Sequence, residues 1–248
     1  MPFRRRLALP EPVRFDALTA RMVGVGMNFA ATPDPDPNIE DTLVLASFEA
    51  MENHDLRVLA VLVTWFRIHA AWVNADRLTH LVAAQVSPRV RALWSALACW
   101  QHKDRRFARL SKLYVGRRQD VIEGGTDFQV TRHGEDVRFD GTPIRVAANI
   151  LRDRTADVFE PSDLARTHRA YRYRVMMGPS YRADMWAALE ADPTLSPAAL
   201  ARRAHGSFST AWHVRRDFEL LANVGSPAIG GSSKKPPKSA GNSSRHTT

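Results

Sequence analysis

The central part of the chain shows the hydrophobic spacing of buried helices. Apolar residues recur at intervals of three and four from 39 to about 53, and the segment 55–72 is apolar nearly all round. The first pattern predicts a helix with one buried face, and the second predicts a helix surrounded by other elements. Asn38 and Asp55 begin these segments and are favourable N-cap residues. We therefore expect a helical core here.

A different pattern follows between residues 127 and 146. Apolar and polar residues alternate on both sides of His133-Gly134, which is typical of a β-hairpin with a tight turn. From residue 145 the apolar spacing is helical again. The chain is therefore expected to be mainly α, with one β-hairpin in its N-terminal domain.

Changes in composition divide the chain into four parts. Residues 1–37 contain repeated prolines and no sustained periodicity, which predicts a flexible arm. Residues 38–160 are expected to form a helical domain that includes the hairpin, and residues 161–224 a second helical domain. Residues 225–248 are rich in Gly, Ser, Pro and Lys and predict a disordered basic tail.

Three short helices are predicted before this tail. Ser196 is a favourable N-cap for the second of them, and either Ser207 or Ser209 is suited to capping the third. Gly206 separates the second helix from the third, as glycine does at many helix C-termini. The three predicted segments are 181–191, 196–205 and 207–222.

Small and apolar residues in the last two segments recur at a fixed spacing. Ala201 and Ala211 are ten residues apart, and so are Ala204 and Val214. This pattern, over residues 196–218, resembles the helix-turn-helix motif of bacterial DNA-binding transcriptional regulators, including winged-helix-like ones. The family usually has glycine at the position that His205 occupies in this chain. The resemblance implies a C-terminal three-helix unit that binds double-stranded DNA.

The same spacing leaves a polar face on the third segment. In the family that the motif resembles, the N-terminal part of this recognition helix contacts base edges in the major groove. Arginine forms paired hydrogen bonds to guanine, and hydroxyl or imidazole groups bind bases or phosphates. Lysines of the tail are expected to add phosphate contacts. The expected DNA-binding residues are Ser207, Ser209, Thr210, Trp212, His213, Arg216, Lys234 and Lys235.

A strongly basic segment lies earlier in the chain, at 103–118. Phe107, Leu110 and Leu113 recur there at helical spacing, which favours an amphipathic helix with a solvated basic face. A second nucleic-acid surface is the alternative interpretation. The basic residues are Lys103, Arg105, Arg106, Arg109, Lys112, Arg117 and Arg118, and the one acid among them is Asp104.

Overall composition supports an anionic partner. The 248 residues include 35 Lys and Arg against 26 Asp and Glu, a formal net charge of +9. Such an excess favours nucleic acid more than a membrane surface. The single cysteine, Cys99, excludes internal disulfides and a cysteine-based zinc site within this chain. We find no signal peptide or membrane span, so a cytoplasmic protein without a membrane partner is expected.

These patterns predict a bacterial transcriptional regulator that uses no cofactor or metal. A homodimer is expected, because two copies of a small motif bind two half-sites of a palindrome. The 38–160 domain is expected to sense an effector or to bind a protein partner. This arrangement is also similar to antitoxin-type regulators of toxin–antitoxin and phage-defence operons, which commonly carry the DNA-binding domain at the other end.

Two other functions compete with this interpretation. One is an adaptor whose C-terminal helices bind a protein partner. The other is an enzyme with a site in the N-terminal domain that the sequence does not reveal. Catalysis is not expected, because the chain contains neither a P-loop nor the glycine motif of dinucleotide-binding folds.

Overall fold

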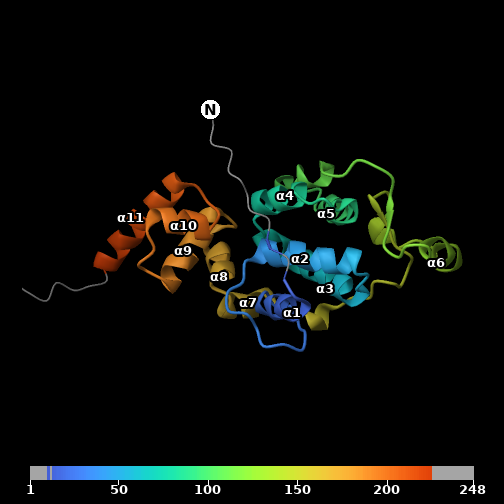
Figure 1. The fold of residues 1–248 in the computed structure, drawn as a ribbon, viewed down its shortest axis with the longest axis horizontal. Coiled ribbons are helices and arrows are strands. Elements are labelled where there is room, and N and C mark those ends of the chain that lie inside the picture. The colour runs from blue at the N-terminus through green and yellow to red at the C-terminus, as the bar shows by residue number, and fades with distance from the viewer. Residues whose placement is uncertain (1–9, 12, 225–248) are drawn as a thin grey trace, which may run out of the picture.

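Helices make up most of the computed structural model, which describes residues 10, 11 and 13–224 (Figure 1). The α-helices are α1 (Phe15–Gly24), α2 (Ile39–Glu52), α3 (Leu56–His69), α4 (Ala75–Ala83), α5 (Pro88–Trp100), α6 (Thr126–His133), α7 (Pro161–Thr167), α8 (Arg169–Met177), α9 (Tyr181–Ala191), α10 (Pro197–Arg203) and α11 (Phe208–Val224). Short 3₁₀ helices are η1 (Ala70–Trp72), η2 (Arg105–Phe107), η3 (Leu110–Lys112), η4 (Val137–Phe139) and η5 (Thr155–Asp157). Two short strands, β1 (Gln119–Asp120) and β2 (Ile144–Arg145), pair in parallel. The mainly α fold expected from the sequence is confirmed.

Buried apolar side chains form two clusters. The larger cluster lies among α1–α5 and extends to Leu164 on α7 and Tyr171 on α8. The smaller cluster is built from α9, α10 and α11. Figure 1 shows α9–α11 together at one end of the molecule and α6 at the other. We call residues 180–224 the C-terminal unit and the described residues before them the N-terminal unit.

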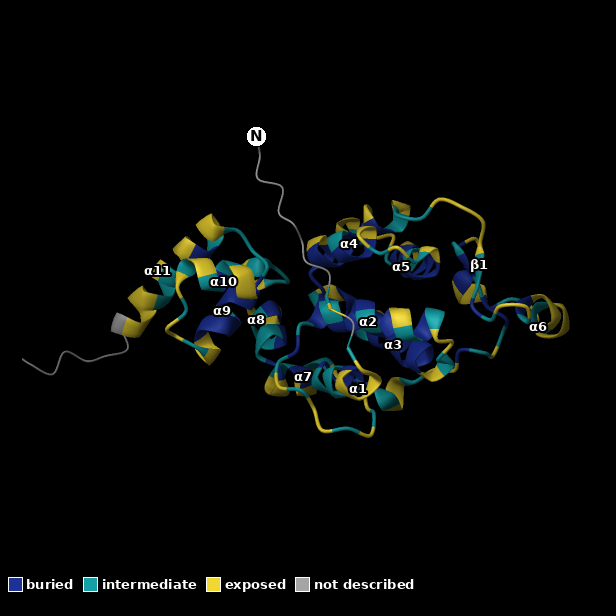
Figure 2. Cartoon of the chain, viewed as in Figure 1, coloured by how far each residue is buried: buried dark blue, intermediate teal, exposed yellow. Residues whose placement is uncertain are grey.

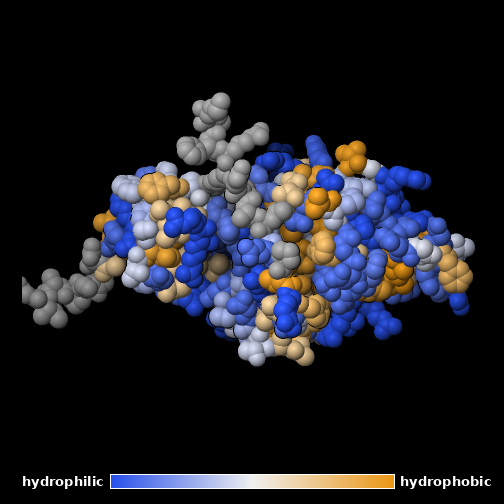
Figure 3. All heavy atoms as spheres, in the orientation of Figure 1, coloured by the Kyte–Doolittle hydropathy of each residue, from blue (hydrophilic) through white to orange (hydrophobic). Residues whose placement is uncertain are grey.

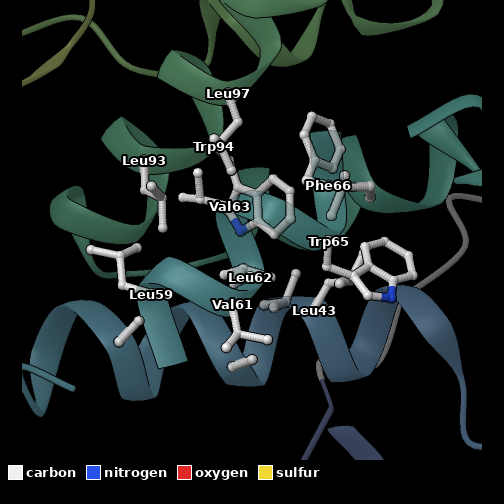
Figure 4. Packing of buried hydrophobic residues seen from close by; sticks show 14 of the residues in the cluster. Leu43, Leu59, Val61, Leu62, Val63, Trp65, Phe66, Leu93, Trp94 and Leu97 are labelled. Carbon is white, nitrogen blue, oxygen red and sulfur yellow. The ribbon is translucent and has the colours of Figure 1, made fainter. Parts of the chain in front are cut away.

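Helix α3 lies at the centre of the larger cluster, as its apolar sequence predicts. Every residue from 58 to 66 is buried. Trp94 of α5 packs edge-on against Phe66 of α3, with ring centroids 5.4 Å apart (Figure 4). The indole N–H of Trp94 donates to the Ser47 hydroxyl on α2 at 2.9 Å. One aromatic side chain therefore joins three helices and still satisfies its polar atom.

The β-hairpin predicted at 127–146 is wrong. Residues 126–133 form α6, and Gly134 follows it with a φ of +78°. A glycine with positive φ serves both hairpin turns and helix C-termini, so the sequence signal at His133-Gly134 fits either structure. The strand that does form, β2, pairs in parallel with the distant β1. An isolated antiparallel bridge links Glu135 to Ala147.

The expected flexible arm is also wrong for part of its length. Helix α1 lies within residues 1–37, and it places Leu18 and Met22 in the larger cluster. These apolar side chains are one helical turn apart, so a short helix is enough to bury both. The tail expected at 225–248 lies outside the described residues, together with Lys234 and Lys235.

Two further helical predictions fail in the N-terminal unit. The basic segment at 103–118 contains η2 and η3 rather than one amphipathic helix. Its apolar residues Phe107 and Leu110 are nevertheless buried, as their spacing indicated. Residues 146–154 form turns and irregular structure instead of a helix. Within the residues that the structure describes, none of the helices combines the length and the apolar character needed to cross a membrane.

His69 links α3 to the segment around α7 and α8. Its Nδ1 lies 2.7 Å from the Tyr171 hydroxyl, and its Nε2 lies 3.0 Å from the Phe159 carbonyl oxygen. A neutral imidazole satisfies both contacts, because Nε2–H donates to Phe159 and Nδ1 accepts from Tyr171. Burial lowers the pKa of His69 to about 4.

Acidification is expected to destabilise the fold through His69. Below the ordinary pKa of about 6.5, the unfolded imidazole binds a proton that the folded one does not, so the free energy of unfolding falls as pH decreases. Between pH 7 and 5 the loss is roughly 1–2 kcal/mol. Urea denaturation across this range measures it, and the His69→Gln protein should show a shallower dependence on pH. Equal slopes for the two proteins would contradict this assignment.

Arg174 of α8 joins the two units through buried ion pairs. Its guanidinium donates to Asp184 of α9 at 2.7 and 2.9 Å, and to Glu40 of α2 at 2.6 and 2.9 Å. All three side chains are buried. Burial opposes the positive charge, but Asp184 and Glu40 outweigh that effect and raise the pKa of Arg174. This cluster fixes the first helix of the C-terminal unit against α2.

Candidate nucleic-acid interface

The helices of the C-terminal unit begin at serines. Ser180 and Ser196 cap α9 and α10 with their side-chain oxygens. The Ser207 hydroxyl oxygen accepts the backbone N–H of Thr210 at 2.9 Å. Ser207 rather than Ser209 therefore caps α11, which leaves the Ser209 side chain exposed to solvent.

Apolar residues hold α10 and α11 together and pack both against α9. The side chains of Ala204, Ala211 and Val214 are all buried, at the positions that their spacing indicated, and Leu200 is buried with them. Leu221 is seven residues after Val214, so helical spacing places it on the same inward face, but its side chain is exposed. Helix α11 has 17 residues and α10 has seven, so the C-terminal part of α11 extends beyond its neighbours. Figure 2 shows this end of α11 as exposed.

The turn between α10 and α11 is a Schellman cap. The N–H of Gly206 donates to the Ala201 carbonyl at 2.9 Å, and the N–H of His205 donates to the Arg202 carbonyl at 3.2 Å. His205 has a φ of +54°, in the left-handed region. This is the position at which helix-turn-helix proteins usually have glycine. Histidine therefore adopts here the backbone conformation that glycine adopts without a steric cost.

His205 is also within the electrostatic influence of charged residues of the N-terminal unit. Its side chain is half-buried. Burial, followed by the positive charge of Arg77 on α4, lowers the pKa of His205 to about 4. The imidazole is therefore neutral at pH 7 and has no positive charge with which to bind a phosphate.

Gly206 does not have a positive φ, and its missing side chain leaves room for side chains of α9. A Cβ at this position would overlap the Cε methyl of Met185 and would lie 3.3 Å from the Cβ of Tyr181. Both neighbours belong to α9, and Met185 is fully buried. The absence of a side chain thus allows the turn to approach α9 closely.

Replacing Gly206 by alanine is expected to destabilise the protein by roughly 1–3 kcal/mol, because the new methyl overpacks the turn. Combining it with Met185→Leu removes the overlapping methyl and should restore part of the loss. Urea denaturation of the two single variants and the double variant measures this coupling. An unchanged stability of Gly206→Ala, or strictly additive effects, would contradict the packing described.

The N-terminal half of α11 presents an exposed polar surface. Ser209, His213 and Arg216 all face solvent, and the Trp212 side chain is about half exposed. The Arg216 guanidinium lies 5.6 Å from the centroid of the Trp212 ring. It also forms an ion pair of 3.1 Å with Asp217. The structure therefore brings these four predicted residues together on one surface.

Two other predicted residues are occupied by local contacts. The hydroxyl groups of Ser207 and Thr210 lie 2.6 Å apart, and Ser207 also caps the helix. Their side chains stabilise the start of α11 instead of facing outward freely. A capping role of this kind depends on which serine begins the helix, and the sequence left that choice open.

Exposed arginines on α10 were missed by the sequence prediction. Arg202 and Arg203 stand at the end of this helix with their side chains in solvent. The sequence could have identified them as candidates for phosphate contacts, because they lie on the helix before the turn. In helix-turn-helix complexes that helix lies against the DNA backbone. Arg215 has a structural role instead, since it donates to Glu219 at 2.6 Å and to the Leu195 carbonyl at 2.9 Å.

No group of His, Cys, Asp and Glu side chains suited to a metal ion is present in the part of the chain that the structure describes. Comparison with protein-family models, curated proteins and solved structures finds no match for this chain. The interpretation of the C-terminal unit therefore depends on its own residues and geometry.

Proposed function

We propose that the C-terminal unit is a helix-turn-helix that binds double-stranded DNA, with α11 as its recognition helix. The turn at His205 and Gly206 is the observation that carries this proposal. His205 has a left-handed backbone conformation at the position where the motif usually has glycine. Gly206 lets the turn approach α9 closely, which matches the compact packing of three short helices. A turn of this geometry exposes the start of α11 to a partner.

The exposed side chains fit the two kinds of contact that DNA recognition needs. Arg216 and His213 on α11 are suited to base edges, and Arg202 and Arg203 on α10 are suited to phosphates. In this proposal the protein is a transcriptional regulator. Its N-terminal unit brings two copies together on a palindromic site. Light scattering that gives a monomer, both free and with bound DNA, would contradict the dimer.

Binding to genomic DNA fragments tests the proposed function. Fluorescence anisotropy at about 50 mM salt, where electrostatic binding is strong, should identify fragments that bind more tightly than a random duplex. The DNA upstream of the protein's own gene belongs in the set. Equal affinity for every fragment would contradict sequence-specific recognition, and no binding at all would contradict a DNA-binding function.

Protein binding is a second candidate function, favoured by apolar side chains on α11. Phe208, Trp212, Leu220 and Leu221 are exposed on this one helix, and Figure 3 shows apolar residues among hydrophilic ones over this part of the surface. Exposed apolar groups concentrated on one element are typical of protein interfaces. An adaptor would bind no DNA and would lose its partner when Leu220 and Leu221 are replaced by serine.

A further inference from the structure

The basic segment between α5 and β1 has a fold that exposes its charges. Phe107 of η2 and Leu110 of η3 are buried in the larger apolar cluster, next to α4 and α5. The Leu110 carbonyl accepts a hydrogen bond from the Ser95 hydroxyl of α5 at 3.1 Å. Two 3₁₀ turns anchored in this way leave the basic side chains of the segment on the surface.

Several cations of this segment lack a counter-ion. Arg106 pairs with Asp104, Arg118 pairs with Glu135, and Arg109 lies 3.8 Å from Asp76. The remaining cations are exposed, and no ion pair is found for them among the residues that the structure describes. These free basic residues are Lys103, Arg105, Lys112 and Arg117. Since like charges repel one another, such a group is best stabilised by an anionic partner.

The basic segment lies close to the start of α11. Arg109 is paired with Asp76 of α4, and Asp76 also accepts a hydrogen bond of 3.0 Å from the Tyr181 hydroxyl. The Cβ of Tyr181, at the start of α9, lies beside Gly206. The next residue, Ser207, caps α11. A short series of contacts thus connects the basic segment to the N-terminal end of α11. This is the end of a recognition helix that contacts base edges.

We infer that this segment of the N-terminal unit forms a second DNA contact that binds the phosphate backbone beside the site of α11. The inference rests on the proposed function, because both surfaces bind the same duplex. One helical turn of DNA extends about 34 Å, so a duplex on α11 is long enough to reach a surface this near. Flexible, unpaired Lys and Arg side chains bind phosphates without reading sequence. The segment would therefore add affinity and not specificity.

The test compares two pairs of alanine substitutions in the full chain. Arg105→Ala with Lys112→Ala removes two free cations of the basic segment. Arg132→Ala with Arg152→Ala removes two exposed cations, one of them on α6 at the opposite end from α11 (Figure 1). Both variants lose the same charge, so any difference between them depends on position. Anisotropy is measured on the best genomic fragment and on a random duplex of the same length, from about 50 to 200 mM salt.

The expected result is an equal loss of affinity for both duplexes in the Arg105 and Lys112 variant. The slope of log affinity against log salt should also fall in magnitude by up to about 1.8, or about 0.9 for each phosphate that the variant no longer neutralises. The control pair should keep the parent slope. If both pairs gave the parent slope while the parent bound its fragment specifically, this inference would fail and the proposed function would stand. If the parent bound neither duplex, the proposed function itself would fail.

Discussion

Replacing Arg174 by methionine is expected to lower the free energy of unfolding by about 3–5 kcal/mol, because it leaves two buried carboxylates without their cation. Glu40 is fully buried, and Asp184 is 8% exposed. Burial favours the neutral form of Glu40, but Arg174, together with the Asn74 backbone N–H and Arg77, outweighs this effect and lowers the pKa of Glu40. Removing the guanidinium takes away that compensation and the five hydrogen bonds that it donates to α2, η1 and α9.

Arg172 provides a matched control on the same helix. It pairs with Glu190 at 2.5 Å, and both side chains remain more than a third exposed. An ion pair exposed to solvent contributes little, so Arg172→Met should cost less than about 1 kcal/mol. Chemical denaturation compares the two variants. Equal losses would contradict the description of Arg174 as the buried connection between the units.

Trp94→Ala is expected to cost about 3–5 kcal/mol, as large cavities in a packed core do. The Trp94 side chain is fully buried between α2, α3 and α5, and its N–H partner Ser47 is also buried. The same substitution at Trp212, which is 48% exposed, should cost less than about 1 kcal/mol. Denaturant titration followed by circular dichroism measures both. A Trp94→Ala protein as stable as the parent would place this tryptophan outside the core.

Signals confined to one helical turn predicted the beginnings of helices well. Asn38, Asp55 and Ser196 each cap a helix in the structure, because an N-cap depends on residues within three positions. The spacing of Ala204, Ala211 and Val214 likewise identified the inward face of the C-terminal unit. Local signals failed where one signal fits two structures. Gly134 ends α6, although a glycine at this place also fits the turn of a β-hairpin.

Long-range contacts were not accessible from the sequence. Arg174 and Glu40 are 134 residues apart, and the chain holds 35 basic and 26 acidic residues from which to choose. The occupation of a left-handed position by His205 could not be predicted either. The usual signal is glycine, and the glycine of this turn lies one residue later, where it provides space for Met185.

If the exposed face of α11 binds DNA, as proposed, removing its polar side chains must weaken binding. Ser209, His213 and Arg216 are changed together to alanine, and Thr210 is kept because it interacts with the cap. The control changes Thr131, Arg132 and His133 of α6, which supply the same three kinds of side chain at exposed positions.

Both proteins are titrated with the best genomic fragment by anisotropy, after their stabilities are shown to match within about 1 kcal/mol. We expect the α11 variant to lose at least about tenfold in affinity, since each base contact contributes roughly 1–3 kcal/mol. The α6 variant should bind like the parent. Parent-like affinity in the α11 variant would contradict DNA binding by this face of α11.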